Sequence, residues 1–169
     1  MTKQKLFWVV AVALLLFTAC NREERNLLGD YSYKLSGEVL FVDADGPSTH
    51  LLIHRNGQMN VLKDKSRPHG LLITMNEMNG GCYTFQADFQ GDSIVISSHQ
   101  FPFQVLSSDG LPSIFSDSVS SFIYHVDAAG SGRSNDKMLI IKEHWNGAQS
   151  GDASVTFHAN EMTILAEKN

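Results

Sequence analysis

The chain has few cysteines and no cluster of positive charge, and both shortages narrow what it can be. Only Cys20 and Cys82 occur among 169 residues, so a disulfide framework within one processed chain is excluded. No stripe of Lys or Arg is present and the formal net charge is −5, which argues against nucleic acid as a partner. After Cys20, no apolar run is long enough to enter a bilayer.

Motifs of enzyme chemistry are also missing. The chain has no Gly-x-Ser-x-Gly nucleophile elbow, no phosphate-binding loop and no dinucleotide fingerprint. His50 and His54 are the one close pair of histidines, and two imidazoles without a third ligand make a poor metal site. We therefore expect no catalytic residue, no cofactor and no metal, and we interpret both histidines as surface residues beside a turn.

The N-terminus is typical of a bacterial lipoprotein signal. Residues 1–5 carry two lysines, an apolar run spans residues 6–17, and Thr18-Ala19-Cys20 follows. A transmembrane helix needs roughly 20 apolar residues, whereas this run is shorter and the charged residues 21–25 come directly after it. We expect cleavage before Cys20 and lipidation of its thiol with acyl chains such as palmitate. The alternative is an ordinary secretory signal with a chance cysteine.

The lipoprotein signal divides the chain into three parts. Residues 1–19 are predicted to be the signal peptide, residues 20–27 a lipidated flexible tether, and residues 28–169 a single domain. The residue directly after Cys20 is Asn21, whereas an Asp at that position would resemble a signal for retention in the inner membrane. The predicted location is therefore the outer membrane of a bacterial envelope, at its periplasmic face or at the cell surface. The protein is expected to be anchored to this membrane through the lipid on Cys20.

From Gly29 onward, apolar residues alternate with polar ones, which indicates strands with one buried face. Asn56-Gly57 is a strong hairpin signal between two such strands. Residues 98–117 contain Pro102 and Pro112 and are predicted to form a long loop with a short edge strand. No window after the signal predicts an amphipathic helix. The predicted strands lie within residues 29–42, 51–53, 59–62, 71–76, 82–89, 93–97, 122–127, 138–145 and 155–165.

About eight to ten strands joined by short turns predict an all-β domain, either an antiparallel up-and-down barrel or a β-sandwich. Successive tight hairpins favour the barrel. The lipoprotein signal, Gly29-Asp30-Tyr31 at the start of the first strand and the meander to the C-terminus resemble the calycin-like barrel lipoproteins of Bacteroidetes. Gly29-x-Tyr31 resembles the Gly-x-Trp start of lipocalins, with Tyr in place of Trp. The resemblance implies a calycin-like barrel, which either fills its own interior or holds one small ligand.

One acidic residue, Glu143, is predicted to lie on the apolar face of its strand. Glu143 alternates in phase with Ile141 and Trp145, and a carboxylate inside a barrel is costly unless it is paired or solvated. The candidate ligand-lining residues are therefore Tyr31, Tyr124, Glu143 and Trp145. The favoured alternative places Glu143 near a strand end, at the barrel rim in water, with the aromatic residues in an ordinary core.

The predicted function is that of a lipid-anchored, non-enzymatic envelope lipoprotein that binds a small apolar ligand or a protein partner. The alternative is an inhibitor or accessory subunit that presents residues 98–117 to an envelope enzyme or transporter. Asp92-Ser93-Ile94 and Asp117-Ser118-Val119 resemble the O-glycosylation acceptor of Bacteroidetes, which implies Ser93 and Ser118 as candidate modified residues.

Overall fold

The protein is a closed barrel of eight antiparallel strands in up-and-down order. The structure, a computed structural model, describes residues 24–44, 48–78, 81–106, 121–135, 137–150 and 152–169. The strands are β1 (Gly29–Asp43), β2 (Thr49–Lys63), β3 (Gly70–Glu77), β4 (Cys82–Gln90), β5 (Ser93–Leu106), β6 (Ser121–Ser134), β7 (Met138–Gln149) and β8 (Asp152–Lys168). Each strand pairs with its neighbours in sequence, and β1 pairs with β8. The predicted barrel is confirmed, and the β-sandwich is excluded.

Alternation along each strand supplies the barrel with its core. Successive residues of a strand point to opposite faces, so every second side chain enters the interior. Along β4, Tyr83, Phe85, Ala87 and Phe89 are buried, while Gln86 between them is exposed. The same pattern in the other strands gives one continuous hydrophobic core inside the barrel.

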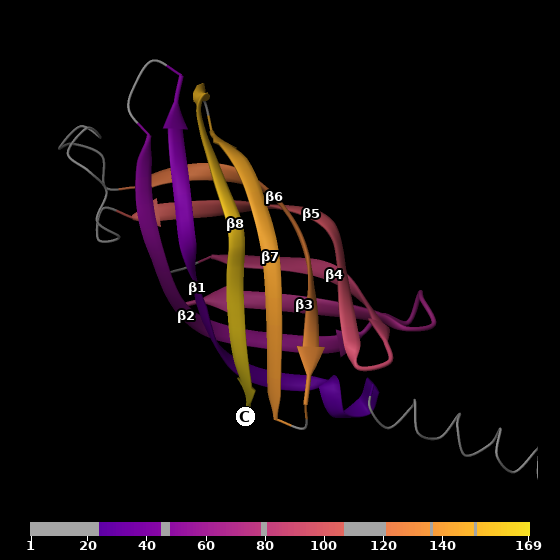
Figure 1. Cartoon of the computed structure of the whole chain (residues 1–169). Helices are drawn as coiled ribbons and strands as arrows, with labels where there is room; N and C mark the ends of the chain where they lie inside the picture. The colour runs from indigo at the N-terminus through magenta and orange to yellow at the C-terminus, as the bar shows by residue number, and fades with distance from the viewer. Residues whose placement is uncertain (1–23, 45–47, 79–80, 107–120, 136, 151) are drawn as a thin grey trace, which may run out of the picture.

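One end of the barrel is covered by the chain that precedes β1. Figure 1 shows β1, β7 and β8 side by side, crossing the direction of β3 and β4 behind them. A helical turn over residues 24–27 lies at the end where β8 finishes. Leu27 of this turn is only 2 % exposed, and the Tyr31 hydroxyl donates a hydrogen bond of 2.7 Å to its carbonyl oxygen. Residues 24–27, assigned to the tether from the sequence, thus pack against the barrel.

The predicted hairpin at Asn56-Gly57 is wrong, because β2 runs through both residues without a break. Gly57 faces the interior between β1 and β3. An added Cβ there would overlap the carbonyl oxygen of Asn76 and lie 2.6 Å from Cε1 of Tyr33. The glycine therefore allows the Tyr33 ring and the backbone of β3 to lie close to β2, and it does not form a turn.

The predicted loop over residues 98–117 is also wrong in its first part, because residues 98–106 belong to β5. Residues 107–117 lie outside the described part of the chain. A bulge between Ile96 and His99 shifts the register of β5 against β6. Since one extra residue exchanges the inward and outward faces, His99, Phe101 and Phe103 point into the barrel after the bulge. Residues 98–106 therefore cannot form part of the loop that the inhibitor or accessory-subunit alternative requires.

Side chains complete the barrel wall between β4 and β5. The ladder between these strands covers only four residue pairs, at the end of β4. Beyond the ladder, the ring of Tyr83 stacks on Phe101 at 4.2 Å and the ring of Phe85 stacks on His99 at 4.5 Å between centroids. We call these four residues the β4–β5 seam. The seam is the part of the wall that depends least on backbone hydrogen bonds.

The edge of β5 beside this seam carries a proline. The carbonyl oxygen of Gln104 accepts a hydrogen bond of 3.1 Å from Nη2 of Arg55 in β2, so it points away from β6. Backbone groups of alternate residues point to the same side of a strand, which places the missing N–H of Pro102 on that same side. The proline therefore leaves the β5–β6 ladder intact, as is usual for proline at a strand edge.

Candidate functional site

A small group of polar side chains lies inside the apolar barrel, with Glu143 at its centre. Glu143 is 1 % exposed, so its expected position at the rim is wrong. The reason is the length of β7, which continues to Gln149 and leaves Glu143 in the middle of the strand. Gly130 of β6 stands opposite, and a Cβ there would lie 2.9 Å from Cγ of Glu143. A side chain at Gly130 would therefore overlap the backbone of β7 and the start of the Glu143 side chain.

The two carboxylate oxygens of Glu143 have different surroundings. Nε1 of Trp145 donates a hydrogen bond of 2.9 Å to Oε2. Oε1 finds no hydrogen-bond partner among the described residues and lies 3.8 Å from Nε2 of His99, which finds none either. That distance is too long for a hydrogen bond. Burial raises the pKa of Glu143 to about 7, against the smaller opposing effect of the bond from Trp145.

His99 is fixed on its other side by the backbone. Its Nδ1 lies 3.1 Å from the carbonyl oxygen of Ser97, and its ring stacks on Phe85. The side chain is 11 % exposed, and burial lowers the pKa of His99 below its ordinary value of 6.5. The imidazole is therefore neutral at pH 7.

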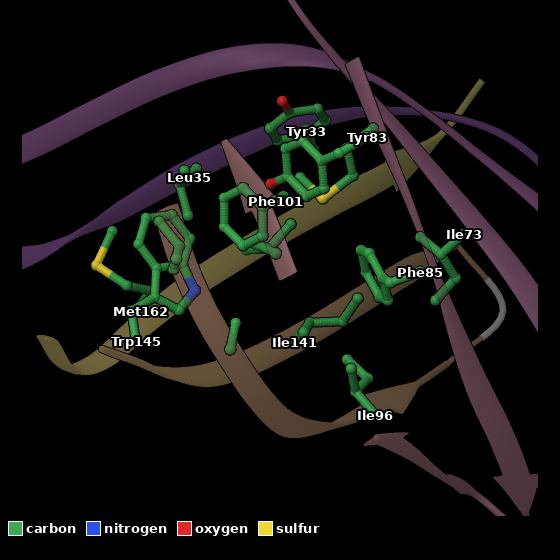
Figure 2. Close-up of a cluster of buried hydrophobic side chains, with 14 of the residues drawn as sticks. Tyr33, Leu35, Ile73, Tyr83, Phe85, Ile96, Phe101, Ile141, Trp145 and Met162 are labelled. Atoms are coloured by element: carbon green, nitrogen blue, oxygen red, sulfur yellow. The ribbon is translucent and has the colours of Figure 1, made fainter. Parts of the chain in front are cut away.

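Tyr83 brings a third polar atom to the same region. Its buried hydroxyl finds no hydrogen-bond partner in the described part of the chain. Burial, and then the nearby charge of Glu143, raise the pKa of Tyr83 well above its usual value. Phe101 lies between Tyr83 and Trp145, stacked on the first and edge-on to the second at 5.2 Å (Figure 2). We call Glu143, His99, Tyr83 and Trp145 the interior polar cluster.

The structure brings together only two of the four predicted lining residues, Glu143 and Trp145. Tyr31 lies at the end covered by Leu27, and Nζ of Lys168 is 5.8 Å from the centroid of its ring. Tyr124 is buried edge-on to Phe41 at 5.3 Å, and it pairs across the ladder with Phe103, whose ring contacts Trp145 at 5.1 Å. Both tyrosines contribute to the packing of the core.

His99 is the cluster member that the sequence does not predict, while Tyr83 lies in the predicted strand over residues 82–89, whose alternation places it in the core. The signal was present, because Phe101, Phe103 and Val105 alternate with polar residues and with Pro102. This alternation did not predict a strand because residues 98–117 were expected to form a loop. The bulge after Ile96 would also have misled a simple count of parity, since it turns His99 inward.

The predicted modification sites are placed only in part. Cys20 and Ser118 lie outside the described residues. Ser93 begins β5 beside a turn, partly exposed, with its hydroxyl donating to a carboxylate oxygen of Asp92 at 3.0 Å. Cys82 is an exposed free thiol at the start of β4.

His50 and His54 both lie on the outer face of β2. Both are exposed, and Nδ1 of His50 is 2.9 Å from Oε1 of Glu38. Among the described residues, no group of three or more His, Cys, Asp or Glu side chains is arranged to hold a metal ion. In the same residues, no helix has the length and apolar character needed to cross a membrane.

Comparison with known proteins leaves the interior of the barrel as the main guide to function. No protein-family model matches the chain, and no curated protein is similar to it. The protein is a closed eight-stranded antiparallel barrel with a polar cluster inside an aromatic core.

Proposed function

We propose that this protein is a lipid-anchored lipoprotein of the bacterial cell envelope that binds a small ligand inside its barrel. The observation that carries the binding role is the set of buried polar atoms without partners on Glu143, His99 and Tyr83. Buried polar groups are nearly always hydrogen-bonded, because an unpaired one costs roughly 1–3 kcal/mol. A bound molecule whose polar group reaches these atoms accounts for them.

The rings around the interior polar cluster set the general character of this ligand. Phe85 and Phe101 lie against His99 and Tyr83, and Trp145 lies against Phe101. Such walls suit an apolar body, whereas the unpartnered atoms suit one polar group. The proposed ligand is therefore amphipathic, rather than the purely apolar ligand expected from the sequence. Rearrangement of the β4–β5 seam is the proposed route to the interior, because side chains rather than a ladder complete the wall there.

The proposed anchor rests on the lipoprotein signal that ends at Cys20. The helical turn that packs on the barrel begins at Glu24, and four residues of extended chain span at most about 14 Å. Lipidation of Cys20 would thus hold the covered end of the barrel close to the membrane. Nζ of Lys168 lies 5.8 Å from the centroid of the Tyr31 ring, a contact similar to that of the late Arg with the first-strand Trp in lipocalins, with both residues replaced.

Native mass spectrometry tests the binding role directly. The processed protein, purified without a tag from its own host, should carry one small molecule that denaturation releases. Glu143→Gln should lower the fraction of protein that retains it. Glu161→Gln is the matched control, because Glu161 is an exposed carboxylate in the neighbouring strand β8, paired with Lys142 at 2.8 Å. A folded protein that never retains a small molecule, or equal retention by both variants, would contradict the proposal.

A further inference from the structure

The interior polar cluster directs two hydrogen-bond acceptors toward each other. The carbonyl oxygen of Ser97 can only accept, so its contact of 3.1 Å with His99 requires the ring proton on Nδ1. In the neutral imidazole, Nε2 is then an acceptor. This atom faces Oε1 of Glu143 across 3.8 Å, which is too long for a direct hydrogen bond. Above the pKa of about 7, Glu143 is ionised and its carboxylate also only accepts, so neither atom can then satisfy the other.

A single group that satisfies both acceptors must carry at least two hydrogens. An atom about 2.8 Å from each could bond to both, since the two acceptors are 3.8 Å apart. A hydroxyl brings only one hydrogen, and an ether, a carbonyl or a carboxylate brings none. An amine or a water molecule brings two or more. The chemistry of the acceptor pair therefore narrows the polar group of the ligand to nitrogen donors, with water as the competitor.

The surrounding rings and the charge of Glu143 favour a cationic donor. Trp145 contacts the rings of Phe101 and Phe103 at 5.2 and 5.1 Å, next to its own bond to Glu143. Aromatic faces attract cations, and hydrogen bonds between a cation and a carboxylate are stronger than neutral ones. Arg55, the buried basic residue in the described part of the barrel, donates to the backbone carbonyl of Gln104 and has its guanidinium carbon 5.8 Å from the centroid of the Phe103 ring.

We infer that the interior polar cluster binds a primary ammonium group, with Oε1 of Glu143 and Nε2 of His99 as its two acceptors. The ligand class is a small primary amine with an apolar or aromatic body, which packs against the rings of the β4–β5 seam. This inference rests on the proposed ligand-binding function and specifies the polar group that the site selects. The buried Tyr83 hydroxyl, which can accept or donate, also has no hydrogen-bond partner in the described part of the chain.

Matched probes separate the amine from its analogues. Phenethylamine, 2-phenylethanol and ethylbenzene share one ring, and butylamine and butanol form a smaller pair. Binding to the processed, lipidated protein in detergent is followed by calorimetry and by the emission of Trp145, which is the only tryptophan after the signal peptide. We expect at least one amine to bind tenfold or more tightly than its alcohol. Glu143→Gln should weaken amine binding at least tenfold and leave ethylbenzene unaffected.

Two further variants test the role of His99 and provide a control for the loss of a carboxylate. His99→Phe keeps a ring to stack on Phe85 but removes the acceptor, so it should weaken amine binding selectively. Glu161→Gln removes an exposed carboxylate and should change nothing. Circular dichroism confirms that each variant keeps its strand content before binding is compared.

The outcomes distinguish this inference from the broader function. Equal affinity for amine and alcohol, or amine binding that survives Glu143→Gln, would overturn the ammonium assignment and leave the binding role standing. A failure of every amine to bind would overturn the assignment as well, as would a crystal structure with amine present that shows only water between Glu143 and His99. The retained-ligand measurement then decides the binding role separately.

Discussion

Glu143→Gln should make the protein more stable at alkaline pH, although it alters a buried residue. Burial raises the pKa of Glu143 from 4.5 to about 7, so the folded state holds this proton more tightly than the unfolded state. The stability that neutral Glu143 provides is fully present below pH 4.5 and is lost as the pH rises through 7. Above pH 8 the loss amounts to about 3 kcal/mol of unfolding free energy, at about 1.4 kcal/mol for each pKa unit.

Glutamine avoids this loss because it never ionises, and its side-chain oxygen can accept the bond that Trp145 Nε1 donates to Glu143. The unfolding free energies of the two proteins should agree within about 1 kcal/mol at pH 4.5, and the variant should be more stable by about 3 kcal/mol at pH 8.5. Urea unfolding at several pH values, followed by Trp145 emission, measures the difference. A difference that does not change with pH would refute the reasoning, because it would mean that Glu143 ionises as easily inside the barrel as in water.

Three other substitutions test the register, the packing and the anchor. Phe85→Ala should lower the unfolding free energy in urea by about 3–5 kcal/mol because the ring is buried, whereas Gln86→Ala on the outer face should change it by less than about 0.5 kcal/mol. Similar effects of the two would mean that the inward face is misassigned. Gly57→Ala should cost about 1–3 kcal/mol in the same assay, since its Cβ would press on Tyr33, and a neutral result would argue against that close approach. Cys20→Ala should abolish palmitate labelling and leave uncleaved precursor on a gel, and normal processing would rule out the lipoprotein signal.

The barrel was predictable because most of its strands have one face in the core and one in water. In β4, the inward set of Tyr83, Phe85, Ala87 and Phe89 is the one that alternation predicts. The order of the strands followed from the turns between them, since neighbours in sequence become neighbours in space, whereas the closure of the sheet comes from the pairing of β1 with β8.

The errors lie where tertiary packing overrides local preference. Asn56-Gly57 has the chemistry of a turn, yet Arg55, Gly57 and Met59 keep the inward phase, and this continuity maintains the strand. The depth of Glu143 depends on the length of β7, whose last residues Asn146-Gly147-Ala148 carry no strand signal of their own. The cluster around Glu143 joins residues from β4, β5 and β7, and no local pattern in the sequence reports that they meet.

The pairing of β1 with β8 makes the folding of this chain depend on its last residues. Asn169 at the C-terminus donates a backbone hydrogen bond of 3.0 Å to Asp30 at the start of β1. Contacts between such distant segments form slowly, because a long stretch of chain must first lose its freedom. A chain that is synthesised from its N-terminus cannot complete the wall until β8 has followed. Until then, β1 has an unpaired edge that can associate with other chains.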